Sequence, residues 1–173
     1  MSRSGYTDDY GDDDPLAMGR WRSAVRSAIQ GKRGQAALRE IAAAMDAMPV
    51  KALAAESLVT ADGEFCTLGV LGQARGMDMA PIDPEDCDAV AQAFGIAPAM
   101  VREIVYENDE SVATERSVTV VIQGPMRPNY PDWGDHRRAT WEPVPNAAER
   151  RWQHMRKWVA DHLIPIRAGG GST

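Results

Sequence analysis

The sequence predicts a mainly α-helical protein: a compact bundle of five or six helices with one strand or small β-hairpin and a proline-rich excursion. Apolar residues recur at helical spacing in several separate segments. Proline and glycine stand where those segments should begin and end. One stretch of roughly 30 residues instead combines β-branched residues with five prolines, and loops of that length are uncommon inside a domain. The length of 173 residues fits about one domain.

The chain divides into five predicted stretches. These are a disordered acidic arm at residues 1–19, a helical core at 20–110, the Pro- and Trp-rich excursion at 111–145, a C-terminal helix of the core at 146–166, and a flexible tail at 167–173. The arm is polar and acidic, so it buries too little apolar surface to order itself. The tail is mostly glycine.

Three helices are expected in the first half of the chain. Helical spacing of apolar residues predicts the first at Trp21–Ile29 and the second at Gln35–Met48. A third is expected at Cys66–Arg75, a buried helix with small residues for close packing. Gly76 follows it in the position that favours a left-handed conformation.

Two further helices follow in the helical core. Asp83 is a candidate N-cap and Pro84 a candidate first residue for a helix that Gly95 ends. Pro98 then opens a helix that reaches about Asn108. Aspartate and proline are residue types that begin a helix, and glycine is a residue type that ends one.

The excursion contains one predicted strand, at Ser117–Ile122, and its prolines argue against regular structure beyond it. The last helix opens at Asn146, which with Glu149 resembles a capping box. Its apolar stripe consists of Trp152, Met155, Val159 and Leu163, and Arg150, Arg151, Arg156 and Lys157 are expected to face away from the core.

Charge is segregated along a chain whose formal net charge is -6. The stretch Arg20–Arg39 has six basic residues and no acid, and Asp78–Glu110 has nine acids against Arg102 alone. The first stretch is able to bind phosphate and the second to meet a basic partner. The structural alternative is that these charges solvate the fold or pair with each other.

A first candidate site is an anion or nucleic-acid site at a helix N-terminus, where backbone N–H groups are free. Its residues are Arg22, Arg26, Gly31, Lys32, Arg33 and Gly34. The spacing is not that of a phosphate-binding P-loop. The structural alternative is a turn between two helices whose glycines supply positive φ.

A second candidate site is Cys66, expected at the start of a helix where the helix dipole favours a thiolate. His154 and Asn108 are the candidate base and orienting group for a cysteine-dependent hydrolase. The flanking residues are strongly apolar, so the alternative is an inert, buried thiol.

A third candidate is a surface that binds a partner. Most of its residues are of the types enriched at interface hot spots, and two acids are added to them. Its residues are Tyr130, Trp133, Arg137, Arg138 and Trp141, with Asp109 and Glu110. Asp132, Asp135 and His136 lie in the same excursion, but their spacing matches no metal site. We therefore expect no metal centre and no cofactor, and the lack of a convincing catalytic set favours a protein that is not an enzyme.

No secretory signal and no membrane-spanning run of about 20 apolar residues is present, which predicts an intracellular protein that does not enter a membrane. The two cysteines, Cys66 and Cys87, are then expected to be free thiols in a reducing compartment.

Five segments of the chain read SGYTDDY, WRSAVRSAIQGKRGQAALRE, GEFCTLGVLGQARGMD, IVYENDE and ERRWQHMRKWVADHL. Together these segments resemble a group of small proteins encoded by tailed phages and prophages. The resemblance covers about Ser4–Glu110 and Glu149–Leu163. The chain departs from it at Ser111–Ala148, where that group has a short connection. It implies phage origin and the cytoplasm of a bacterial host, but no functional residues carry over.

The leading hypothesis is a phage or prophage accessory protein that binds a host or phage macromolecule, for instance to inhibit a host defence or nucleic-acid-processing protein. This step is an analogy with other small phage proteins. The alternatives are a nucleic-acid-binding protein that uses Arg22, Lys32 and Arg33, and a hydrolase that depends on Cys66. The oligomeric state is left open.

Overall fold

The computed structural model describes residues 3–5, 16–121 and 137–165. The chain forms two compact units. The helical unit comprises Met1–Val112 with Ala148–Thr173, and the hairpin unit comprises Ala113–Ala147. The described secondary structure confirms a mainly α-helical fold with a small antiparallel hairpin.

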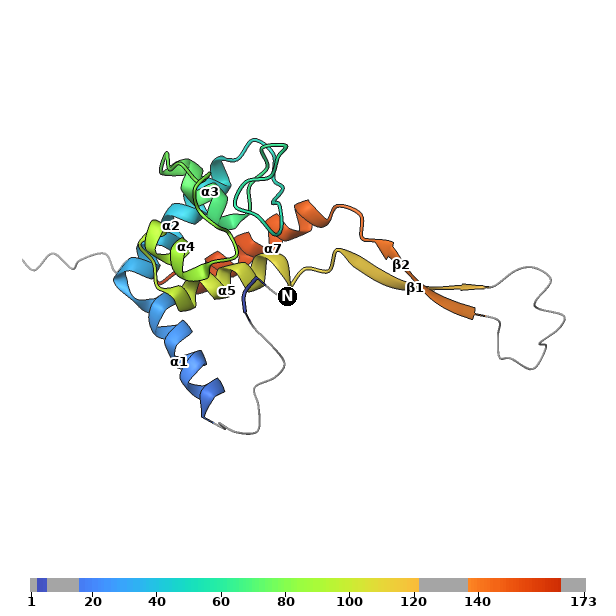
Figure 1. The fold of residues 1–173 in the computed structure, drawn as a ribbon, viewed down its shortest axis with the longest axis horizontal. Coiled ribbons are helices and arrows are strands. Elements are labelled where there is room, and N and C mark those ends of the chain that lie inside the picture. The colour runs from blue at the N-terminus through green and yellow to red at the C-terminus, as the bar shows by residue number, and fades with distance from the viewer. Residues whose placement is uncertain (1–2, 6–15, 122–136, 166–173) are drawn as a thin grey trace, which may run out of the picture. The chain divides into compact units, whose positions relative to one another are not determined.

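The helices lie close to where caps and periodicity predict them (Figure 1). They are α1 (Ala17–Gln30), α2 (Lys32–Ala47), α3 (Thr67–Ala74), α4 (Cys87–Phe94), α5 (Pro98–Asp109) and α7 (Ala147–His162). The first helix begins inside the stretch assigned to the acidic arm. The second begins three residues before its predicted start, because Gly31 is the only residue that separates it from α1.

The α1–α2 junction depends on a close approach of two backbones. A Cβ at position 34 would lie 2.1 Å from the carbonyl oxygen of Ala28, so Gly34 lets α2 pack against the end of α1. Gly31 has a φ of -66° and caps α2 without a side-chain hydrogen bond. Gly31 therefore lies in a turn between helices, whereas Gly34 lies within α2. Neither has the positive φ that the structural alternative required, and Gly34 instead allows the close contact.

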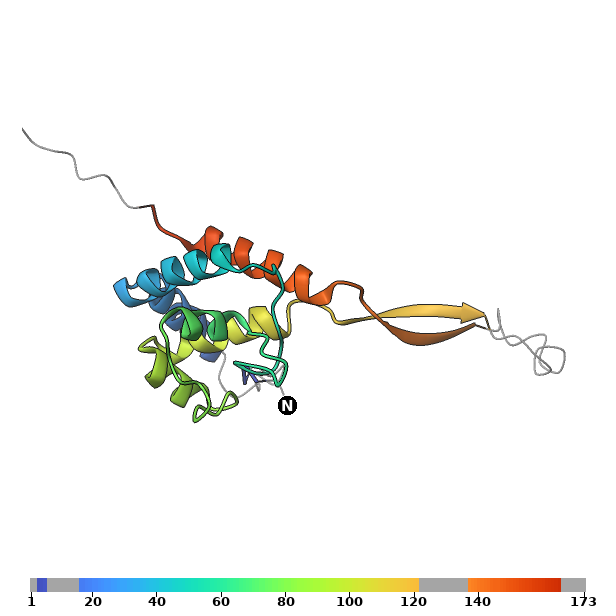
Figure 2. The same ribbon diagram turned by 90° about the horizontal axis from the view of Figure 1, so that it is seen from above.

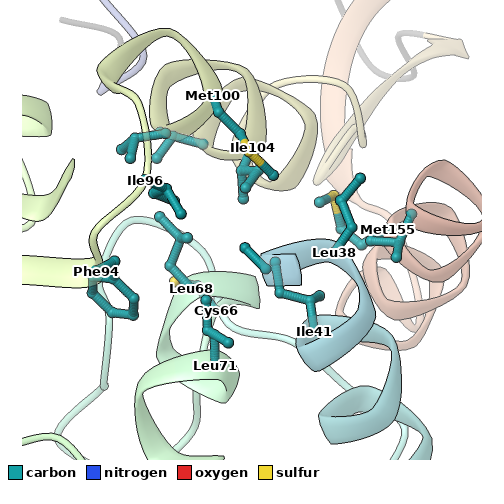
Figure 3. Close-up of a cluster of buried hydrophobic side chains, with 14 of the residues drawn as sticks. Leu38, Ile41, Cys66, Leu68, Leu71, Phe94, Ile96, Met100, Ile104 and Met155 are labelled. Carbon is teal, nitrogen blue, oxygen red and sulfur yellow. The ribbon is translucent and has the colours of Figure 1, made fainter. Parts of the chain in front are cut away.

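The core of the helical unit brings together side chains from α1, α2, α3, α4, α5 and α7. Figure 3 labels core residues from each of these helices except α1. Its largest fully buried side chains include Leu38, Ile41, Met45, Leu53, Leu68, Leu71, Met100, Ile104 and Met155. Each buried side chain of this size contributes about 1.5–3 kcal/mol relative to exposure. The core therefore joins segments that lie more than 100 residues apart in the sequence, such as Leu38 and Met155.

The predicted N-cap of α4 is wrong by three residues. Asp86 is the cap, and its Oδ1 accepts hydrogen bonds from the N–H groups of Asp88 and Ala89 at 3.0 and 2.9 Å. Asp83 instead closes a turn by accepting from Glu85 N–H at 2.9 Å. Both aspartates are suitable caps, and the first is used by the turn. Gly95 ends the helix in the left-handed region, as predicted.

The last helix differs from its prediction in two ways. Asn146 has a φ of 57°, whereas the cap residue of a capping box normally has extended backbone. Arg151 is 3% exposed and not on the solvent face. It shares a buried face with Met155 and Trp158, four and seven residues further along the helix.

The hairpin unit contains two antiparallel strands, β1 (Glu115–Val121) and β2 (Arg137–Pro143), which form one twisted ribbon (Figure 2). The register pairs Glu115 with Pro143 at one end and Val121 with Arg137 at the other. The second strand corrects the expectation that prolines exclude regular structure after β1. Pro143 occupies the last position of β2, where its missing N–H is tolerated.

Candidate functional site

The most highly connected polar group of the helical unit is Asn108, at the C-terminal end of α5 and 2% exposed. Its Oδ1 accepts hydrogen bonds from the Thr67 N–H at 3.1 Å and from the Thr67 hydroxyl at 2.8 Å. Its Nδ2 donates to the carbonyl of Ala54 at 3.0 Å and to Asp109 Oδ1 at 2.6 Å. All four hydrogen-bonding positions of the amide are therefore used.

Arg151 of α7 joins the same cluster from the other side. Its Nε donates to the carbonyl of Asn108 and its Nη1 to the carbonyl of Leu53, each at 2.8 Å. Burial lowers the pKa of Arg151, and the negative charge of Asp109 acts in the opposite direction. A guanidinium stays charged at any ordinary pH, so Arg151 is a buried cation at the carbonyl end of α5.

Asp109 holds an N-terminal residue against the helical unit. Its Oδ2 accepts a hydrogen bond from Arg3 Nη1 at 2.9 Å, and both side chains are less than a tenth exposed. Arg3 Nε also donates to the Pro84 carbonyl at 3.2 Å, and the neighbouring Ser4 is fully buried. The arm predicted as disordered at residues 1–19 is therefore ordered at Arg3–Ser4.

We call this cluster of Arg3, Thr67, Asn108, Asp109 and Arg151 the polar network. It links α3, α5, α7 and the segment at Leu53 and Ala54, and its groups are paired with one another. Asn108 and Asp109 therefore serve the fold and are not available to a substrate or partner. Glu110, the second of the two acids predicted to bind a partner, caps the end of α5 and is exposed.

Cys66 caps α3, and its Sγ accepts a hydrogen bond from the Gly69 N–H at 3.4 Å. The side chain lies among Leu68, Leu71 and Ile41 in the core (Figure 3). Burial raises the pKa of the Cys66 thiol, and this effect exceeds that of the hydrogen bond. The expectation that the helix dipole would favour a thiolate is thus wrong, because desolvation penalises the charged form more.

His154 contacts residues other than Cys66. Its Nε2 lies 2.7 Å from Glu107 Oε2 and 3.0 Å from the hydroxyl of Ser111. Serine, histidine and a carboxylate also form catalytic triads, but there the hydroxyl and the carboxylate bind opposite nitrogens of the ring. Here both meet the same nitrogen, so the cluster links α5 to α7 without the geometry of a triad.

The predicted anion site lies on the surface. Arg22, Arg26, Lys32 and Arg33 are exposed, and none of them forms an ion pair with another residue that the structure describes. Arg22 and Arg26 line one side of a cavity of about 430 Å³, together with Trp21 and residues 161–165. These cations are accessible to solvent, but the fold does not bring their side chains together at one site.

The hairpin candidates are only partly described. Tyr130, Trp133 and the trio Asp132, Asp135 and His136 lie outside the described residues. Arg137 and Arg138 open β2, and Trp141 near its end is 66% exposed. Over residues 3–5, 16–121 and 137–165, no group of three or more potential metal ligands occurs. No helix in that same part is long and apolar enough to span a membrane.

Comparisons add no relative: the chain matches no protein-family model, and searches of curated proteins and of solved structures found no similar protein.

Replacing Asn108 with alanine is expected to lower the free energy of unfolding by about 3 kcal/mol. The change leaves the Thr67 N–H, the Thr67 hydroxyl and the Ala54 carbonyl buried without their partner. Urea denaturation measures the loss. Gln153→Ala, at an exposed position of α7, is the control and should change stability by no more than about 0.5 kcal/mol. Equal effects of the two substitutions would contradict a central role for Asn108.

Cys66 is expected to resist alkylation in the folded protein, because burial raises its pKa and excludes the reagent. The measurement is iodoacetamide labelling of the Cys87→Ala variant at about pH 7.5. The same variant in about 6 M urea should label fully. Rapid labelling of the folded variant would contradict the inert interpretation and favour the hydrolase.

The raised pKa of Cys66 also predicts the direction of a pH effect. Above the ordinary thiol pKa of 9.0, the unfolded chain loses this proton while the folded chain keeps it. Stability from this group is therefore present below that pH and falls as the pH rises. The Cys66→Ala variant should lose this part of the slope.

Proposed function

We propose that this protein is a phage or prophage accessory protein that acts in the bacterial cytoplasm by binding a protein partner. In this proposal the hairpin unit makes the contact, and the partner belongs to host defence or nucleic-acid processing. The phage origin rests on the resemblance of the sequence segments. The binding role rests chiefly on one observation, the exposed side chain of Trp141 on the ribbon.

The two faces of the ribbon carry their charged residues at different positions. Residues that oppose each other in an antiparallel pair share a face, so Trp141 lies on the side of Ser117, Thr119 and Ala139. These four side chains are uncharged and exposed, and the charged residues of that face, Glu115 and Arg137, stand at opposite ends of the ribbon. The other face carries an Arg116–Glu142 pair at 3.6 Å, Arg138 and two half-buried valines, Val118 and Val120.

A ribbon of this size gains stability from a binding partner. A two-stranded hairpin in water is at best marginally stable, because it has no second layer to cover a face. Tryptophan is the residue type most enriched at interface hot spots, and burying it in a partner's pocket contributes strongly to affinity. The uncharged centre of the face around Trp141 therefore supports protein binding better than it supports contact with phosphate.

Nucleic-acid binding is a second candidate function. It is favoured by Arg22, Arg26, Lys32 and Arg33, which are exposed and unpaired within the described part of the chain. The formal net charge of -6 opposes it.

Trp141→Ala is expected to reduce capture of the partner by about tenfold or more, since a hot-spot tryptophan contributes at least ~2 kcal/mol. Tagged full-length protein is incubated with lysate of a bacterial host, and bound proteins are quantified by mass spectrometry. The control is Leu16→Ala, because Leu16 is 67% exposed and Trp141 is 66% exposed. A protein that binds wild type and both variants equally would count against the hairpin contact.

For the second candidate, a double variant Lys32→Ala with Arg33→Ala should abolish a gel shift of duplex DNA at low salt. Affinity of the wild type should also fall steeply with added salt, because phosphate contacts release counterions. The matched control removes two exposed cations from α7, Arg150→Ala with Lys157→Ala. No shift by the wild-type protein at low salt would eliminate this function.

A further inference from the structure

An apolar groove lies on the helical unit, and its lining contains none of the residues used in the proposed function. It forms a cavity of about 490 Å³ between the end of α2, the following segment and the end of α3. Its apolar lining includes Ala44, Ala47, Met48, Val50, Phe65 and Ala74. The volume is large enough for the side chains of a bound segment and is within the usual range of ligand pockets.

The groove forms because small residues occupy the positions where α2 and α3 approach each other. Ala44 and Ala47 from α2 face the cavity together with Ala74 from α3. At its edge Val50 is 68% exposed, which leaves a large apolar side chain in water. Phe65 is half-buried and packs against the core, so the floor of the groove is fixed. An apolar surface with a fixed floor favours a partner with apolar side chains.

Acidic residues lie at the groove. The groove is at the C-terminal ends of α2 and α3, and the end of α3 carries partial negative charge, whereas Lys51 caps the last carbonyls of α2. Glu64 belongs to the lining, and Asp62 lies two residues before it. Both acids are exposed and form no ion pair among the described residues.

The two cations next in sequence to these helix ends are already engaged. Lys51 Nζ donates to the carbonyls of Met45 and Asp46 at 3.1 and 2.6 Å. Arg75 donates to Glu40 at 2.6 Å and to the Phe94 carbonyl at 2.7 Å. Glu64 therefore keeps its charge available at the groove, and charge complementarity favours a basic partner.

The backbone of the groove limits how a partner is recognised. The α2 and α3 residues of the lining have their N–H groups paired within helices, so they offer no strand edge for a peptide to extend. Recognition must then come from side chains, as when an amphipathic helix places its apolar face in a groove. We infer that this groove binds a basic amphipathic helix of a protein partner, with Lys or Arg beside Glu64.

The test uses the full chain and a fluorescein-labelled designed helix of about 14 residues, with Leu at i, i+3, i+4 and i+7 and Lys elsewhere. Fluorescence anisotropy should show saturable binding with a Kd below about 100 µM. A peptide of the same pattern with Glu for Lys should bind at least about tenfold more weakly. Absence of saturation, or equal binding of the Glu peptide, would overturn the inference.

Two pairs of variants locate the binding. Ala47→Phe fills the groove and should weaken binding about tenfold, whereas Ala36→Phe, at an exposed position on the same helix, should change it less than about twofold. Glu64→Lys should weaken binding about threefold, and Glu85→Lys should leave it unchanged. Equal losses within either pair would place the peptide elsewhere and overturn the inference. Circular dichroism verifies that each variant is folded.

Discussion

The arrangement of the helical unit depends on one constraint: every polar group buried at the end of α5 needs a hydrogen-bond partner. Asn108 satisfies its four positions with Thr67, Ala54 and Asp109, and Arg151 then satisfies the carbonyl of Asn108 itself. Groups of this kind cost little when fully paired and much when one partner is missing. The network therefore selects a single arrangement of α3, α5 and α7, which hydrophobic packing alone would specify less sharply.

The same kind of contact engages the residues that resemble catalytic groups. Cys66, Asn108 and His154 each take part in contacts that hold the fold together. The exposed groups on which the proposals rest are Trp141, the acidic edge of the apolar groove, and the cations Arg22, Arg26, Lys32 and Arg33. These surfaces support the proposal that the protein acts by binding.

Local signals in the sequence predicted most of the helices. Pro98 opens α5, and Gly95 and Gly76 adopt the positive φ expected after helices. These features act within a few residues, so a pattern reveals them. The buried position of Arg151 could not be predicted, because its partners Leu53 and Asn108 lie 98 and 43 residues away. The second strand could not be predicted for a similar reason. It pairs with β1 across the length of the excursion, and Pro143 at its end argued against a strand.

The network also fixes the two points of the helical unit between which residues 113–147 are inserted. Arg151 binds the carbonyl of Asn108, and the carbonyl of Ala148 accepts from the Leu53 N–H, so the end of α5 and the start of α7 are held without help from the intervening chain. Lengthening such a closed insertion costs only about 0.6 kcal/mol for each doubling. The length and sequence of this segment can therefore change with little effect on the stability of the helical unit.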